Sequence, residues 1–129
     1  MNLLLDTHIA IWAVEDNPRL SQAARALLLE PAASIFVSVA SLWEIAIKHA
    51  QHGAKDMPMS AKDALGFFYA SGYTIVPVAP AHVLMLEGIP RLHDDPFDRL
   101  LVATALTEPY RLITSDARLG AYGSIVTVV

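Results

Sequence analysis

The sequence contains no cysteine among its 129 residues, which excludes both a disulfide framework and a thiolate metal site. No apolar run approaches the ~20 residues that a helix needs to cross a bilayer. The N-terminal segment reaches an acidic residue at Asp6 with no basic region before it, unlike a secretory signal. We therefore expect an unexported protein of the reducing cytoplasm.

The sequence also lacks an excess of basic residues. Nine Lys and Arg residues stand against 13 Asp and Glu residues, which gives a formal net charge of -4. This balance argues against a protein that coats DNA regardless of sequence, because such binding depends on a basic surface. A nuclease remains compatible with it, since acids around a metal ion are neutralised locally by that ion.

The length of the chain fits one domain, so we expect residues 1–129 to share a single hydrophobic core. Hydrophobic residues make up 54% of the sequence, which is high for so short a chain. This surplus predicts a well-filled core and an apolar face left over for association.

Short β-branched or leucine-rich runs alternate with longer stretches whose apolar residues recur at helical spacing. The predicted strands are Leu3–Leu5, Ile35–Val37, Tyr73–Val78, Leu112–Thr114 and Ile125–Val129. The predicted helices are Ser21–Glu30, Ser41–His49, Ser60–Ser71, Ala81–Glu87 and Pro96–Thr107. Helices between successive strands indicate right-handed crossovers. We therefore predict an α/β fold, a three-layer α/β/α sandwich around a mostly parallel five-stranded sheet.

Three helix starts have recognisable capping residues. Ser41 with Glu44 and Ser60 with Asp63 have the spacing of a capping box. Asp95-Pro96 combines an acid that can act as N-cap with a proline at the first helical position.

Four carboxylates fall near the predicted carboxyl ends of strands. Asp6 follows the first strand, Glu44 lies early in the next predicted helix, Asp98 lies in the first turn after Pro96, and Asp116 follows the fourth strand. Ligands of open parallel sheets bind in the crevice beyond these strand ends. We expect the four acids to converge there although they are distant in sequence.

Convergence of four acids requires a cation. Two like charges ~4 Å apart repel by about 1 kcal/mol in bulk water and by about 4 kcal/mol at an effective dielectric of 20. Carboxylate ligands without cysteine or an evident histidine set favour Mg²⁺ or Mn²⁺ over Zn²⁺. Mg²⁺ keeps several waters and holds phosphate oxygens, which suits hydrolysis of phosphodiester bonds.

Each of three acids also has a purely structural interpretation. Glu44 can complete the capping box and pair with Lys48 four residues later. Asp98 can stabilise a helix N-terminus, and Asp116 can be an ordinary turn residue. Asp6 fits a structural role less well, because it directly follows a buried strand. The prediction of a metal site therefore depends on the combination.

Four sequence blocks resemble the PIN-domain ribonucleases, in particular the VapC-type toxins of bacterial toxin–antitoxin pairs. The blocks are Leu3–His8, Ser38–Lys48, His93–Ala103 and Leu112–Asp116. They occur in order and span almost the whole chain, which makes the resemblance specific.

The resemblance implies a metal-dependent endoribonuclease. It assigns the metal-binding cluster to Asp6, Glu44, Asp98 and Asp116, with Mg²⁺ or Mn²⁺ as cofactor. Metal-activated water would attack the phosphodiester in line and leave 5′-phosphate and 3′-hydroxyl ends. Three further side chains match accessory positions of the family. Thr7 and Thr114 match positions where hydroxyls lie beside the cluster. Asp95 is expected mainly to cap a helix and, in addition, to act on the metal site from outside the direct ligands. The implied partners are RNA, a cognate antitoxin protein and a second copy of the chain in a homodimer.

Aromatic and basic side chains near these blocks are candidates for contacts with RNA. Trp12 and Trp43 can stack on bases, but their neighbours Ile11 and Ile45 favour packing in the core or in a dimer. Roles on the solvated surface or in ion pairs fit the basic residues at least as well as phosphate binding. The basic candidates are Lys48, Arg91, Arg99 and Arg118.

Two other functions remain open. One is a Mg²⁺-dependent phosphatase or 5′-nuclease on a similar sheet, although Asp6-Thr7-His8 lacks the second aspartate that a phosphatase places two positions on. The other is a protein-binding module, namely a PIN fold that has lost catalysis or a signalling receiver. A receiver needs paired acids after the first strand and a phosphate acceptor after the third, and Val78-Ala79-Pro80 provides no acceptor.

Overall fold

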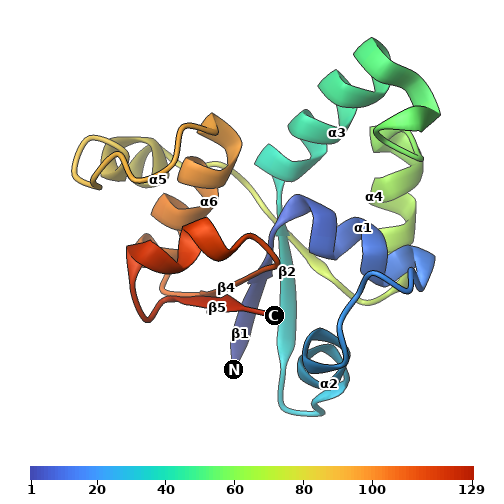
Figure 1. Ribbon diagram of the computed structural model, residues 1–129, viewed down its shortest axis with the longest axis horizontal. Coiled ribbons are helices and arrows are strands. Elements are labelled where there is room, and N and C mark those ends of the chain that lie inside the picture. The colour runs from blue at the N-terminus through green and yellow to red at the C-terminus, as the bar shows by residue number, and fades with distance from the viewer.

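Five parallel strands form one sheet in the order β3-β2-β1-β4-β5 in the computed structural model, which describes residues 1–129 (Figure 1). The strands are β1 (Asn2–Leu5), β2 (Ser34–Ser38), β3 (Thr74–Val76), β4 (Arg111–Thr114) and β5 (Val126–Val128). All five predicted strands are confirmed, with ends that differ by at most two residues. The sheet is wholly parallel.

Six α-helices and two 3₁₀ helices connect the strands. The elements are α1 (Thr7–Glu15), α2 (Gln22–Leu29), α3 (Val39–His52), η1 (Gly53–Lys55), α4 (Ala61–Ala70), α5 (Pro80–Met85), α6 (Pro96–Thr107) and η2 (Ala117–Tyr122). Figure 1 shows α1, α3 and α4 on one side of the sheet and α5 and α6 on the other. None of the helices combines the length and apolar character needed to span a membrane.

The central strand β1 separates two apolar clusters. Leu3 and Leu5 pack with Ile9, Ile45 and residues of α1, α3 and α4, whereas Leu4 packs with residues of α6 and η2. Successive residues of a strand point to opposite faces, so an uninterrupted leucine run is buried on both. This arrangement confirms the three-layer α/β/α prediction.

β1 is also the strand at which the connections change direction across the sheet. It pairs with β2 on one side and with β4 on the other, so that Leu5 lies beside Val37 and beside Ile113. The residues that follow these three strands therefore leave the sheet at the same edge. A crevice at such a switch point is where ligands of parallel sheets bind.

The helix α1 was not predicted from the sequence. Its first residues include Thr7, Ile9, Ala10 and Ile11, all of them buried. A helix buried on several sides has no polar stripe to reveal its period. Its N-cap is Asp6, whose carboxylate accepts a hydrogen bond from the Ile9 amide at 2.9 Å.

The predicted start of α3 is corrected by the structure. Ser38, not Ser41, is the N-cap, and its hydroxyl accepts from the Ala40 amide at 3.0 Å. Ser41 lies inside the helix and is buried. Glu44 is consequently not part of a capping box. The other two predicted N-caps, Ser60 and Asp95, are confirmed by hydrogen bonds from backbone amides within the first helical turn.

Helices α5 and α6 are connected at both ends. The buried His82 of α5 contacts the Glu108 carboxylate just beyond α6 at 2.5 Å, and its Nδ1 accepts from the Ala79 amide at 3.0 Å. At the opposite end Arg99 of α6 donates to the carbonyl of Leu86 at 3.5 Å. These contacts fix the position of α6, whose first turn carries Asp98.

Candidate metal centre

The carboxylate of Asp6 joins the ends of two neighbouring strands. Asp6 is only 5% exposed, and one of its oxygens caps α1. The other accepts a hydrogen bond from the hydroxyl of Thr114, the last residue of β4. The same hydroxyl accepts from the Asp116 amide at 3.0 Å. Thr114 therefore orients two of the predicted site acids at once.

Glu44 reaches this edge of the sheet from the second turn of α3. It is buried, and one carboxylate oxygen accepts from the Thr7 hydroxyl at 2.6 Å. The other accepts from the Lys48 ammonium at 2.5 Å, which confirms the i,i+4 pair suggested by the sequence. The Ser41 hydroxyl lies 2.9 Å from Thr7 Oγ1. Thr7 thus occupies a position directly beside the acid, as the resemblance implies.

Asp98 and Asp116 meet on either side of a histidine. The Nε2 atom of His93 lies 2.9 Å from an oxygen of Asp116 and 3.7 Å from an oxygen of Asp98. One ligand atom from each of the three side chains lies within 4.8 Å of the other two. Asp116 is in addition held by two hydrogen bonds from the Arg118 guanidinium, at 2.9 and 3.1 Å.

His93 is a candidate site residue that the sequence analysis missed. Its Nδ1 accepts a hydrogen bond from the Asp95 amide at 3.0 Å, so in the neutral ring the proton is on Nε2. Nε2 therefore donates to Asp116 and does not offer a lone pair to a cation. One feature of the sequence could have indicated it. His93 precedes Asp95, the N-cap of α6, by two residues, and at this spacing a histidine ring can accept a hydrogen bond from the backbone amide of the N-cap residue.

Asp6, Glu44 and Asp98 are close enough to influence one another electrostatically. Burial, together with the charges of Asp95, Asp6 and Glu44, raises the pKa of the Asp98 carboxyl from 3.8 to about 7. Burial also raises the pKa of Asp6, against the hydrogen bond from Thr114. The Arg118 guanidinium holds the pKa of Asp116 well below its usual range.

These residues fit a hard divalent cation. The acids that converge offer carboxylate oxygens, and the His93 nitrogen facing them carries a proton, so the donors are the oxygens that Mg²⁺ or Mn²⁺ prefers. Among the four site acids Asp98 is the one that three acidic neighbours act on, and neither Lys48 nor Arg118 forms an ion pair with it. A cation bound between Asp98 and Asp116 would relieve that repulsion.

The remaining predicted residues lie around the acids. Asp95 caps α6 through bonds from the Phe97 and Asp98 amides, so its main role is structural, as expected. Among the basic candidates, Lys48 and Arg118 are paired with site acids, and Arg91 is exposed. The Nε of Arg99 is buried without a hydrogen-bond partner. Contacts of these four residues with RNA stay a prediction.

The comparison with known proteins fits this geometry. Residues 3–124 match the family model described as PIN domain. The chain belongs to the PIN-domain family. A curated relative of this PIN-domain protein is Ribonuclease VapC22 of Mycobacterium tuberculosis, which is 31% identical over 123 residues, covering 93% of this chain and 91% of the relative.

Solved structures share the fold of this PIN-domain protein. VapBC2 from Rickettsia felis, bound to a DNA fragment from its promoter, superposes with a TM-score of 0.70 at 17% identity, covering 99% of this chain and 98% of that one. A toxin–antitoxin complex from Klebsiella pneumoniae gives 0.67 at 20% identity, covering 98% and 96%. These likenesses agree with the wholly parallel five-stranded sheet.

Proposed function

We propose that this PIN-domain protein is a divalent-metal-dependent endoribonuclease and the toxin of a toxin–antitoxin pair, with Mg²⁺ or Mn²⁺ as its cofactor. The family and the ribonuclease relative support hydrolysis of RNA. The observation that carries the proposal is the convergence of carboxylates from β1, α3, α6 and the end of β4, next to the only histidine whose ring contacts two acids.

The four acids of this proposal have different tasks. Asp98 and Asp116 hold the cation, because their oxygens lie closest together around His93. Asp6 and Glu44 are buried and held by threonine hydroxyls, which suits acids that orient ligands or waters behind the cation. A bound divalent cation supplies a water of lowered pKa and positive charge at the scissile phosphate.

The groups around the acids preserve this geometry. His93 donates to Asp116 and so fixes the direction of its free lone pairs. Lys48 compensates part of the negative charge at Glu44. Lys48 is only half-buried, so its ammonium is also accessible to a phosphate oxygen that approaches the acids. The protein then contributes position and charge without a side-chain nucleophile.

The proposed partners follow from the same family. The structural relatives include complexes of toxin and antitoxin, which supports a cognate antitoxin as inhibitor of this chain. Exposed apolar side chains such as Trp43 and Leu84, 58% and 65% exposed, support association into a homodimer. We propose the cytoplasm as the compartment in which RNA, antitoxin and enzyme meet.

The test is RNA cleavage by the purified chain with Mg²⁺, with Mn²⁺ and with EDTA. Asp6→Asn and Asp98→Asn should abolish cleavage while circular dichroism remains that of the wild type. Asn retains the N-cap at position 6, so the helix start survives the loss of charge. Asp63→Asn, which changes an exposed acid of α4, is the matched control and should cleave at the wild-type rate.

Growth arrest separates a toxin from a housekeeping nuclease. Expression of the chain alone should arrest growth, and expression of the neighbouring open reading frame should relieve the arrest. Wild-type rates in Asp98→Asn, in a preparation free of other nucleases, would remove the assigned metal role. A wild-type protein that binds its neighbour but cleaves no RNA would instead be an inactive binding module.

A further inference from the structure

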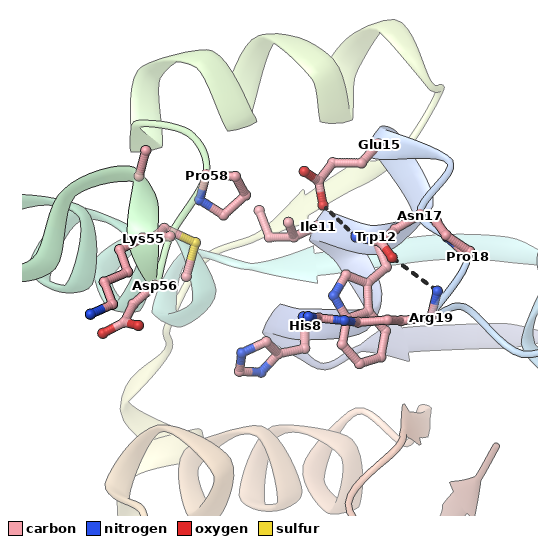
Figure 2. A pocket seen from close by; sticks show the side chains of 12 residues that line it. His8, Ile11, Trp12, Glu15, Asn17, Pro18, Arg19, Lys55, Asp56 and Pro58 are labelled. Carbon is pink, nitrogen blue, oxygen red and sulfur yellow. Dashed lines mark hydrogen bonds between the residues drawn. The ribbon is translucent and has the colours of Figure 1, made fainter.

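A cavity of about 600 Å³ lies between α1 and the segment that runs from η1 to Pro58 (Figure 2). Figure 2 shows Trp12 and Arg19 on one side of it and Lys55 and Asp56 on the other. None of these residues belongs to the metal centre. The cavity is the largest in the molecule, and the function described above does not use it.

This cavity continues towards the metal centre. A second hollow, of about 430 Å³, shares His8 and Asp56 with it and is also lined by Lys48 and Phe97. Lys48 bonds to Glu44, and His8 follows Asp6 by two residues at the start of α1. A strand bound across the acids can therefore extend past His8 into the larger cavity.

Two acids and two basic residues line the cavity, and they differ in whether they already have partners. Asp56 lies 3.6 Å from a ring nitrogen of His52, and the Glu15 carboxylate accepts a hydrogen bond from the side-chain amide of Asn17 at 3.4 Å. By contrast, no carboxylate lies within ion-pair distance of the Arg19 guanidinium or the Lys55 ammonium, and neither side chain makes a hydrogen bond. Both cations are therefore available to a bound anion.

The cavity also offers a flat aromatic wall. Trp12 is half-buried, and part of its ring packs against the core cluster around Ile9 and Ile11. The His8 ring lies beside it, with centroids 5.9 Å apart and planes tilted by 51°. An aromatic face next to free cations is the combination that single-stranded nucleic acid uses, with bases stacked and phosphates paired.

We propose that this cavity is a nucleotide subsite for the RNA strand flanking the cleaved bond. One base stacks against Trp12 beside His8, and Arg19 and Lys55 hold the adjoining phosphates. The inference depends on the proposed ribonuclease function and adds the residues that select the single-stranded segment next to the cut. An RNA strand fits better than a protein segment because the cavity leads from the phosphate-cleaving acids and has unpaired cations.

The first experiment measures fluorescence from Trp12. A Trp43→Phe background leaves Trp12 as the only tryptophan. The full chain is titrated with homopolymeric RNA oligonucleotides of one to eight nucleotides, with Ca²⁺ as the divalent ion and with the RNA confirmed to be intact afterwards. Stacking of a base should quench the fluorescence, and the quenching should begin only at the length at which the strand reaches the cavity.

The second experiment measures the dissociation constant for the longest of these RNAs. Trp12→Leu should weaken binding about tenfold, within the roughly 5–150-fold range of a stacked base, while Trp12→Phe should restore most of it. Arg19→Gln and Lys55→Gln should each reduce the slope of log Kd against log salt by about 0.7. Lys62→Gln removes the same charge from α4 outside the cavity and should leave the slope unchanged.

The outcomes distinguish this subsite from the proposed function itself. RNA cleavage by the wild-type chain, without quenching of Trp12 in the Trp43→Phe background and with wild-type binding by both glutamine variants, overturns the subsite alone. A wild-type chain that neither binds nor cleaves RNA overturns the ribonuclease proposal and the subsite with it. Variants that lose affinity for the protein of the neighbouring reading frame, but not for RNA, identify the cavity as a protein docking site and also overturn the proposal.

Discussion

The hydroxyl of Thr114, at the end of β4, donates its hydrogen to the carboxylate of Asp6, at the end of β1, across 108 positions of sequence. The backbone amide of Asp116 donates to the same hydroxyl at 3.0 Å. The pairing of β1 with β4 thus determines the direction of two acids at the proposed metal centre. Stability and metal binding are consequently coupled through this threonine.

Thr114→Val should affect both properties. Valine keeps the shape and the strand preference but leaves a buried Asp6 oxygen and the Asp116 amide without their partner. We expect the free energy of unfolding to fall by about 1–3 kcal/mol, measured by urea denaturation, and Mg²⁺ affinity to fall with it. Thr127→Val, in the edge strand β5, is the control with an exposed partner and should change stability by less than about 0.5 kcal/mol. Equal effects of the two substitutions would contradict the assigned role.

The stability of the metal-free protein should decrease from pH 4 to pH 7. The folded state raises the pKa of Asp98 to about 7 and also raises that of Asp6, so it retains protons that the unfolded chain releases near pH 4. A pKa raised from 3.8 to about 7 corresponds to at most roughly 4 kcal/mol. The depressed pKa of Asp116 acts in the opposite direction, but its contribution is lost only below about pH 4, outside this window.

Asp98→Asn tests this pH dependence directly. The substitution removes the carboxyl that titrates near pH 7 without changing the shape of the side chain. We expect the variant to exceed the wild type in thermal midpoint at pH 8, in EDTA, and to match it near pH 4.5. A midpoint at pH 8 that is no higher than that of the wild type would show that Asp98 is not under electrostatic strain from its neighbours.

Binding of a divalent cation should release a proton near neutral pH. Asp98 is partly protonated at pH 6.5, and it must lose that proton to act as a ligand. Calorimetry of Mg²⁺ or Mn²⁺ binding in two buffers of different ionisation enthalpy should give different apparent enthalpies at pH 6.5. The difference should disappear at pH 8.5 and in Asp98→Asn. Identical apparent enthalpies at pH 6.5 would place the cation elsewhere.

His93→Ala should weaken the cation site without removing a ligand. The ring donates to Asp116 and is itself fixed by the Asp95 amide. Loss of such an orienting partner typically reduces metal affinity by about 10–100-fold. His52→Ala, which changes an exposed histidine at the end of α3, provides the control and should leave the affinity unchanged. An affinity reduced no more than in the control would limit His93 to a structural role.

Much of the fold follows from local sequence patterns. The leucine run of β1 and the apolar runs of β2 and β4 are strands buried on both faces, so their position and parallel pairing could be predicted. The Lys48–Glu44 pair follows from its spacing on a helix. These features depend on neighbours a few residues away, which a single sequence contains.

The parts that could not be predicted depend on tertiary contacts. Helix α1 begins at Asp6. The sequence analysis interpreted Asp6 only as a metal ligand, but its carboxylate is also the N-cap of this helix. Ser41 has the spacing of a cap, but its hydroxyl is needed beside Thr7, and Ser38 caps the helix instead. The proton on His93 Nε2 is determined by the backbone of Asp95, a geometry that no spacing rule specifies.

Asp6, Asp95 and Asp116 each begin a helix as well as line the proposed centre. Substitutions at these positions therefore have two costs, because most replacements would remove a helix N-cap as well as a carboxylate of the proposed centre. A descendant released from selection for activity should keep Asp, or exchange it for Asn or Ser, at all three. Within the lineage of this chain, substitutions at Asp98 and Glu44, which cap nothing, would be the earlier sign of lost catalysis.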